Sequence, residues 1–194
     1  MRPWSTPDTD DAVRAAFEAV PRADFLPGTQ RWRAGFDGPI GIGHGQTNSQ
    51  PRTVATMLTL LDVHPGQRVL DVGSGSGWTT ALLGHLVGPT GTVLGVELEP
   101  ELAGWGARNL SRAGMPQASI RLAEPGVLGA PAEAPWDRIL VSAGASVLPS
   151  ALVDQLAPQG LMVIPVGGWL TTVALDAGRV RTSVHGPYRF VPLR

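Results

Sequence analysis

A glycine-rich segment between two apolar stretches is the part of this 194-residue sequence that most clearly predicts chemistry. The run from Val69 to Trp78 reads VLDVGSGSGW, in which Gly73, Gly75 and Gly77 alternate with serines after Asp71. Glycine lets a backbone approach a ligand closely and adopt torsion angles that other residues avoid. The turn that follows the first strand of a doubly wound sheet is where a nucleotide-like cofactor binds. We therefore expect a cofactor site at this turn.

The spacing of the glycines distinguishes between cofactors. A dinucleotide fingerprint has the form G-x-G-x-x-G, but here Trp78 stands in the sixth position and the third glycine comes one residue early, at Gly77. The pattern G-x-G-x-G preceded by an acid is the arrangement of Rossmann-like methyltransferases. A carboxylate at Asp71 suits the cationic ammonium of S-adenosylmethionine better than it suits a phosphate. The segment therefore predicts S-adenosylmethionine as the cofactor.

A second acid, Glu97, ends the next apolar run, 20 residues beyond Gly77. A carboxylate at this place can accept hydrogen bonds from both ribose hydroxyls. The alternative is a glycine turn that only joins a strand to a helix, with Glu97 as a solvated strand end. The order of strand, turn, helix, second strand and terminal acid favours cofactor binding. The predicted contacts are Asp71, Gly73, Ser74, Gly75, Ser76, Gly77, Glu97 and Leu98.

The surrounding pattern predicts the elements that hold these residues. Short apolar runs alternate with helical patterns, which is typical of a parallel sheet covered by helices on both faces. The runs are 68–72, 92–96, 119–122, 138–142 and 161–166, and the helical patterns are 10–20, 53–61, 78–87, 99–113 and 149–156. Residues 169–193 read as two or three strands with turns at 176–178 and 185–187, which form an antiparallel edge. We expect one domain over residues 1–194, in which 52–194 form the Rossmann-like core.

The segment from Pro27 to Pro51 is dense in glycine, proline and polar residues. Such a composition argues against a regular element, and a loop of this length in a compact domain is usually functional. Together with the first helix it makes up the N-terminal part of the chain, residues 1–51. We interpret the loop as a lid.

Composition excludes several classes of function. The net charge is −1 and the basic residues are 15 scattered arginines, so no basic stripe predicts a nucleic-acid or membrane surface. The chain has no cysteine and no lysine, which excludes disulfides, cysteine zinc sites, a thiol nucleophile and Schiff-base chemistry. The four histidines lack metal-ligand spacing. No apolar run approaches the ~20 residues that span a bilayer. We expect a soluble, cytoplasmic, monomeric protein without a metal.

Several further motifs carry a resemblance to one family. They are Val20-Pro21-Arg22, Phe25-Leu26-Pro27, the block IGHGQTNSQP over 42–51, and the later blocks APWD over 134–137, ALVDQL over 151–156, VIPVG over 163–167 and FVPL over 190–193. Over about residues 12 to 193 the chain resembles the protein-L-isoaspartate (D-aspartate) O-methyltransferase family. The resemblance implies a class I S-adenosylmethionine-dependent methyltransferase that methylates the free carboxylate of L-isoaspartyl residues in damaged proteins or peptides. The ester then closes to a succinimide, which starts repair.

The resemblance also implies roles for individual residues. Ser49 maps onto the serine placed at the methyl acceptor, and Thr47 and Asn48 would lie along the cofactor. Glu124 would take the place of the aspartate that holds the adenine. The chain departs from the family at Asn48, where Ile or Met is usual, and at Glu124-Pro125-Gly126, where an Asp-Gly pair is usual.

Three alternatives remain open at this point. Ser49 could serve only as an N-cap, or stand one residue before it, for the helix that begins near Arg52. The enzyme could modify one dedicated aspartyl peptide, although such relatives tend to carry C-terminal extensions and this sequence stops at Arg194. The chain could also be a non-catalytic S-adenosylmethionine-binding homologue, with Asn48 and Glu124-Pro125 as the cause of lost activity.

Overall fold

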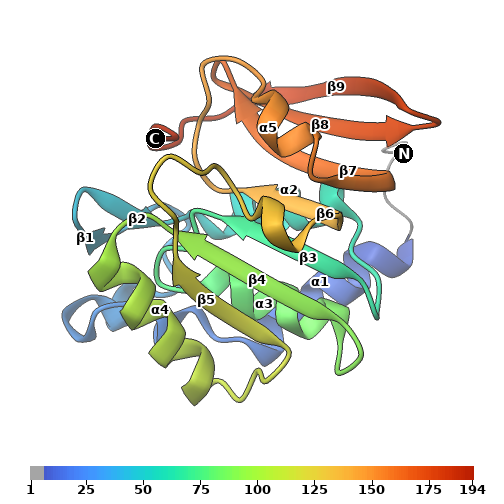
Figure 1. Cartoon of the computed structure of the whole chain (residues 1–194). Coiled ribbons are helices and arrows are strands. Elements are labelled where there is room, and N and C mark those ends of the chain that lie inside the picture. Colours follow the sequence, from blue (N-terminus) through green and yellow to red (C-terminus); the bar gives the residue numbers. More distant parts are fainter. Residues whose placement is uncertain (1–6) are drawn as a thin grey trace.

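A mixed seven-stranded sheet, with the strand order β5-β4-β3-β6-β7-β8-β9, forms the centre of the computed structural model, which describes residues 7–194 (Figure 1). The strands from β5 to β7 pair in parallel, whereas β8 pairs antiparallel with β7 and β9 pairs antiparallel with β8. Their bounds are β3 Arg68–Val72, β4 Thr92–Glu97, β5 Ala118–Leu122, β6 Trp136–Val141, β7 Leu156–Val166, β8 Trp169–Asp176 and β9 Arg179–Pro187. The predicted fold class, a mostly parallel sheet with an antiparallel C-terminal edge, is confirmed.

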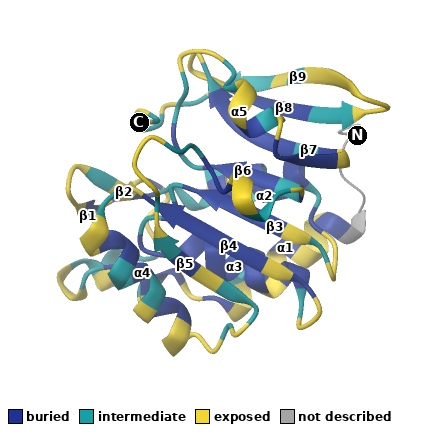
Figure 2. Ribbon diagram, viewed as in Figure 1, coloured by how far each residue is buried: buried dark blue, intermediate teal, exposed yellow. Residues whose placement is uncertain are grey.

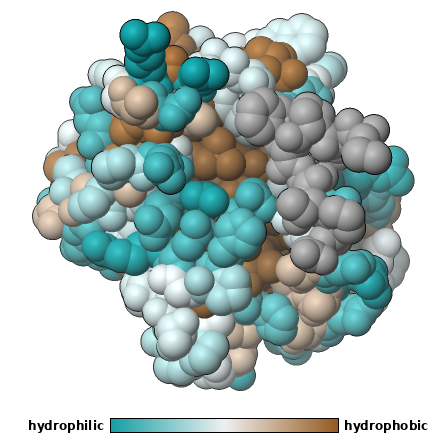
Figure 3. All heavy atoms as spheres, turned by 90° about the vertical axis from the view of Figure 1, so that its right-hand side faces the viewer, coloured by the Kyte–Doolittle hydropathy of each residue, from teal (hydrophilic) through white to brown (hydrophobic). Residues whose placement is uncertain are grey.

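Apolar packing on both faces explains why the parallel strands read as continuous apolar runs. Along β3, Val69 belongs to a buried cluster with residues of α1–α4, whereas Leu70 and Val72 belong to a second cluster on the other face. The helices are α1 Pro7–Ala19, α2 Pro51–Leu61, α3 Trp78–Val87, α4 Pro100–Arg112 and α5 Ser150–Val153. Figure 2 shows the buried residues concentrated in the central strands and in the helix faces turned toward them. Figure 3 shows the right-hand side of the same view, where hydrophilic side chains surround smaller apolar areas.

The segment that we interpreted as an irregular loop contains regular structure, which corrects that prediction. After two short 3-10 helices, η1 Arg22–Phe25 and η2 Gly28–Arg33, the strands β1 Ile40–Gly43 and β2 Gln46–Asn48 form an antiparallel hairpin. His44 and Gly45 at its turn both have positive φ, 53° and 71°, as the tightest hairpin turns require. Figure 1 shows the hairpin on the side where the arrowheads of β3 and β4 end.

Two predictions in the C-terminal half need correction. The helix expected over 149–156 is the single turn α5, because the chain is already paired with Trp136 of β6 at Leu156, where β7 begins. The turn expected at 185–187 lies inside β9. After β9 the chain returns to the centre of the sheet, where the Gly144 amide donates to the Val191 carbonyl and the Leu193 amide donates to the Gly144 carbonyl, both at 2.8 Å.

Candidate active site

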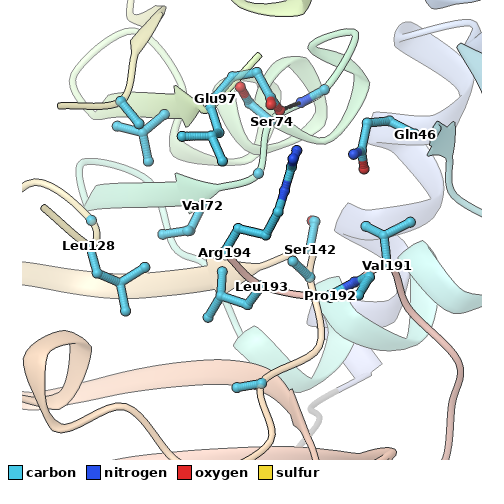
Figure 4. A pocket seen from close by; sticks show the side chains of 18 of the residues that line it. Gln46, Val72, Ser74, Glu97, Leu128, Ser142, Val191, Pro192, Leu193 and Arg194 are labelled. Atoms are coloured by element: carbon cyan, nitrogen blue, oxygen red, sulfur yellow. Dashed lines mark hydrogen bonds between the residues drawn. The ribbon is translucent and has the colours of Figure 1, made fainter. Parts of the chain in front are cut away.

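A cavity of about 490 Å³ opens at the carboxyl ends of β3, β4 and β6. From β3 the chain adds β4 and β5 on one side of the sheet and then β6 on the other side, so the strand order reverses at β3. Doubly wound sheets bind their ligands at such a switch point. The volume is in the range of small-molecule sites. Six parts of the chain meet here: the glycine turn, the end of β4 at Glu97, the hairpin with Ser49, the loop from Ala123 to Gly129, the segment from Ser142 to Pro149, and the C-terminal tail (Figure 4).

The glycine turn is held in place by hydrogen bonds to β4 and α4. The amides of Gly73 and Ser74 donate to the Val96 carbonyl at 2.9 and 3.2 Å, and the Asn109 side chain of α4 donates to the Ser76 carbonyl at 2.8 Å. Gly77 has a φ of 89°, and a Cβ there would stand 3.0 Å from the Gly106 carbonyl of α4. Gly77 does not line the cavity, so its part is to let α4 pack against the turn.

Glu97 presents a carboxylate that the backbone has already oriented. It is 7% exposed, its Oε2 accepts from the Gly75 amide at 2.8 Å, and its Oε1 accepts from the Glu99 amide at 3.0 Å. Each carboxylate oxygen can accept a further hydrogen bond. The neighbouring Leu98 and the exposed Glu124, which follows the adjacent strand β5, also line the cavity. The arrangement provides two adjacent acceptors of the kind that a ribose diol requires.

Asp71 does not line the cavity, which corrects the expectation that it contacts the cofactor. Strand alternation turns it to the same face as Val69, beneath α3, whereas Val72 lines the cavity. Its Oδ2 accepts from Thr79 and Thr80 at 2.8 and 2.7 Å. Burial, opposed by these two hydrogen bonds, raises the pKa of Asp71 to about 6. Because Thr79 lines the cavity and Asp71 does not, Asp71 supports the turn from within the fold.

Two buried hydroxyls in the cavity wall have no hydrogen-bond partner among residues 7–194. They belong to Ser74 on the glycine turn and to Ser142 just after β6, and both residues line the cavity (Figure 4). A buried hydroxyl without a partner costs about 1–3 kcal/mol, so such groups fit a polar ligand. Ser142 was not among the residues predicted from the sequence, although the end of the run 138–142 beside the glycine turn was a signal for it.

The hairpin brings Thr47, Asn48 and Ser49 to the same cavity. Thr47 is exposed, Asn48 is buried and Ser49 is half-buried. The Ser49 hydroxyl has no hydrogen-bond partner within the described range 7–194. The N-cap of α2 is Gln50 without a side-chain cap, and the Arg52 amide donates instead to Asp37 at 3.1 Å. Ser49 stands one residue before this N-cap, as the capping alternative allowed, but its side chain does not cap the helix.

The C-terminal tail forms the remaining wall. Residues Val191 to Arg194 line the cavity, and Arg194 Nη2 lies 2.5 Å from Glu99 Oε1. Figure 4 shows the Arg194 side chain extending from the tail toward the end of the cavity where Ser74 and Glu97 lie. Among the described residues that line the cavity, Arg194 is the one cation, beside Glu97 and Glu124. Arg194 was not among the residues predicted from the sequence.

The sequence model of the protein-L-isoaspartate (D-aspartate) O-methyltransferase family matches residues 7–194. The chain belongs to this family. A relative in Methanopyrus kandleri named protein-L-isoaspartate O-methyltransferase is 46% identical to this methyltransferase over 187 residues, which cover 93% of this chain and 82% of the relative. A relative of the same name in Aeropyrum pernix is 45% identical over 95% of this chain and 73% of its own length.

Solved structures agree with this assignment. A putative protein-L-isoaspartate O-methyltransferase from Plasmodium falciparum, in complex with S-adenosyl-L-homocysteine, has a TM-score of 0.81 at 27% identity, over 95% of this chain and 90% of that one. Another structure with the enzyme's name has a TM-score of 0.83 at 24% identity over 96% of this chain and 62% of that one, a likeness of fold. Family membership makes the chain an S-adenosylmethionine-dependent methyltransferase.

Within residues 7–194, acidic and histidine side chains do not form a group of three that could ligate a metal ion. Over the same range, none of the helices has the length and apolar character needed to cross a bilayer.

Proposed function

We propose that this methyltransferase transfers a methyl group from S-adenosylmethionine to the free carboxylate of L-isoaspartyl residues in damaged proteins or peptides, which starts their repair through a succinimide. One observation carries the proposal: the unpartnered hydroxyl of Ser49 faces the same cavity as the oriented carboxylate of Glu97. The names of the relatives support the choice of acceptor.

The residues of the cavity fit the cofactor. Glu97 would accept from the two ribose hydroxyls, and the Ser74 and Ser142 hydroxyls would gain the polar partners that they lack in the protein. The backbone of Gly73 to Ser76 would lie against the methionine part, with Thr47, Asn48 and Leu98 at the edges and Glu124 near the adenine. When bound, the cofactor supplies an electrophilic methyl group.

The chemistry demands little of the protein beyond positioning. A carboxylate with an ordinary pKa near ~4 is ionised at neutral pH, so no general base is needed. Ser49 would donate a hydrogen bond that orients one acceptor oxygen. The hairpin and the tail from Val191 to Arg194 line the cavity, and bound ligands would displace water from it, which would strengthen the attraction between opposite charges inside it. Methoxide leaves an ester carbonyl far more readily than oxide leaves a carboxylate, so the neighbouring backbone amide nitrogen can attack the ester, release methanol and close the succinimide without the enzyme.

The experiment is transfer of labelled methyl to an isoaspartyl peptide beside its normal aspartyl twin. We expect label on the isoaspartyl peptide alone, and loss of that label as methanol at mildly alkaline pH. Label that survives overnight at alkaline pH would show N-methylation and contradict a carboxylate acceptor. Equal labelling of the twin would contradict the repair function.

Two finer expectations belong to the same proposal. Activity as a monomer stays a prediction, which light scattering of the active enzyme tests. A cytoplasmic location stays a prediction.

A further inference from the structure

The guanidinium of Arg22 is buried behind the hairpin, and its partners are amide oxygens rather than carboxylates. Arg22 is 6% exposed and lies over the ring of Trp78, 5.4 Å from its centroid. Its Nη1 donates to the Phe36 carbonyl at 2.8 Å and its Nη2 to the Gly38 carbonyl at 2.9 Å. Burial lowers the pKa of Arg22 to about 10, so the group still carries its charge and all its donors at neutral pH.

The same guanidinium fixes the backbone around Ser49. Arg22 Nη2 donates to the Asn48 carbonyl at 3.1 Å and to the Ser49 carbonyl at 2.8 Å. These carbonyls belong to the peptide planes before and after the Cα of Ser49, so one rigid group sets the orientation of both. The direction in which the Ser49 side chain leaves the backbone follows from that orientation.

Asn48 continues this network to the glycine turn. Its Oδ1 accepts from Arg22 Nε at 2.7 Å, and its Nδ2 donates to Ser76 Oγ at 3.2 Å. Arginine only donates, so the oxygen of the amide must face Arg22 and the nitrogen must face Ser76. Asn48 and Ser76 are 5% and 2% exposed. Both polar ends of Asn48 are thus engaged within the protein rather than with a ligand.

We propose that Arg22 and Asn48 are positioning residues that hold the acceptor side of the site, at Ser49, in register with the cofactor side, at Ser76. The inference rests on the proposed function, since it concerns the distance between acceptor and methyl group. Methyl transfer depends on near-attack geometry, and a misplacement of about 1 Å can lower a rate about a hundredfold. The link therefore acts on turnover more than on the affinity for either ligand.

The test is a double-mutant cycle on the link. Asn48→Leu removes both hydrogen bonds at similar volume, and Ser76→Ala removes the acceptor on the other side. We expect each variant to lower kcat about ten- to a hundredfold, with S-adenosylhomocysteine affinity within about threefold of wild type. The double variant should be no worse than the worse single variant, because both changes break the same link. Arg31→Gln, an exposed arginine of the same N-terminal segment, is the matched control and should keep wild-type kcat.

Arg22→Lys adds a test of the guanidinium itself, because an ammonium cannot hold the Asn48 amide and the carbonyls around Ser49 together. We expect a lower kcat that Arg31→Lys does not show. Should Arg22→Lys fail to fold, the cycle on Asn48 and Ser76 still decides the matter. Fully active Asn48→Leu, or strictly additive losses in the double variant, would overturn the inference while wild-type turnover upholds the proposed function. Absence of wild-type turnover on the isoaspartyl peptide would overturn both.

Discussion

Removal of the Glu97 carboxylate has consequences that can be worked out from its two backbone contacts. Glu97→Ala takes away both ribose acceptors and leaves the amides of Gly75 and Glu99 without their partner. Hydrogen bonds to a charged group contribute about 1.5–3 kcal/mol, so S-adenosylhomocysteine affinity should fall about 10- to 150-fold. Glu97→Gln keeps one acceptor oxygen, so its S-adenosylhomocysteine affinity should lie between those of wild type and Glu97→Ala.

The same change should also affect the fold. Unpaired amides cost about 1–3 kcal/mol, which for a domain of this size lowers Tm by about 2–12 °C. Calorimetric titration well below Tm separates the two effects. Glu101→Gln is the control, because it removes the same charge from α4 at an 81% exposed side chain outside the cavity and should leave the affinity unchanged. A folded Glu97→Ala whose affinity stays within twofold of wild type would refute the placement of Glu97 at the ribose.

Three other predictions follow from the site. Ser49→Ala should lower kcat/KM for the isoaspartyl peptide about ten- to a thousandfold with Tm and cofactor affinity unchanged, and a fully active variant would contradict the acceptor role. Arg194→Ala should release the tail from Glu99 and speed S-adenosylhomocysteine dissociation about two- to fivefold in stopped flow, with high salt abolishing the difference. Burial raises the pKa of Asp71 to about 6 in the folded protein, against an ordinary value of 3.8. The folded protein therefore binds this proton more tightly than the unfolded chain does. Wild type should therefore lose stability relative to Asp71→Asn as pH rises from about 4 to 6, with no further change above; urea unfolding across this range checks it, and a pH-independent difference would contradict the burial argument.

The elements that the sequence predicted well are those with strong periodicity. The bounds of β3 and α3 match the predicted runs 68–72 and 78–87, because a buried parallel strand and a helix packed against it leave continuous or regularly spaced apolar residues. The hairpin was missed because its strands have only four and three residues and its glycines hide the alternation of Ile40 and Ile42, which are both buried.

The residues of the candidate site also differ in how well the sequence predicted them. Glu97 and the glycine turn were predictable, since strand ends in this topology meet at one edge of the sheet. Asp71 was misplaced because the motif alone was considered, whereas its period-two relation to Val69 places it under α3. Arg22 was read only as part of a family motif, because its partners lie 12 to 27 residues away and no spacing rule connects them.

The two departures from the family pattern were the basis for the non-catalytic alternative, and the structure accommodates both. The Asn48 side chain accepts a hydrogen bond from Arg22 and donates one to Ser76, so both of its polar ends have partners. Pro125 takes the second position of a turn that the Val127 amide closes on the Glu124 carbonyl at 3.1 Å, a position where proline's missing N–H is not needed. Gly126 follows with a φ of 74°, and Glu124 still lines the cavity. Neither departure closes the cavity or leaves a buried polar group without a partner, so a loss of turnover would need a cause outside these residues.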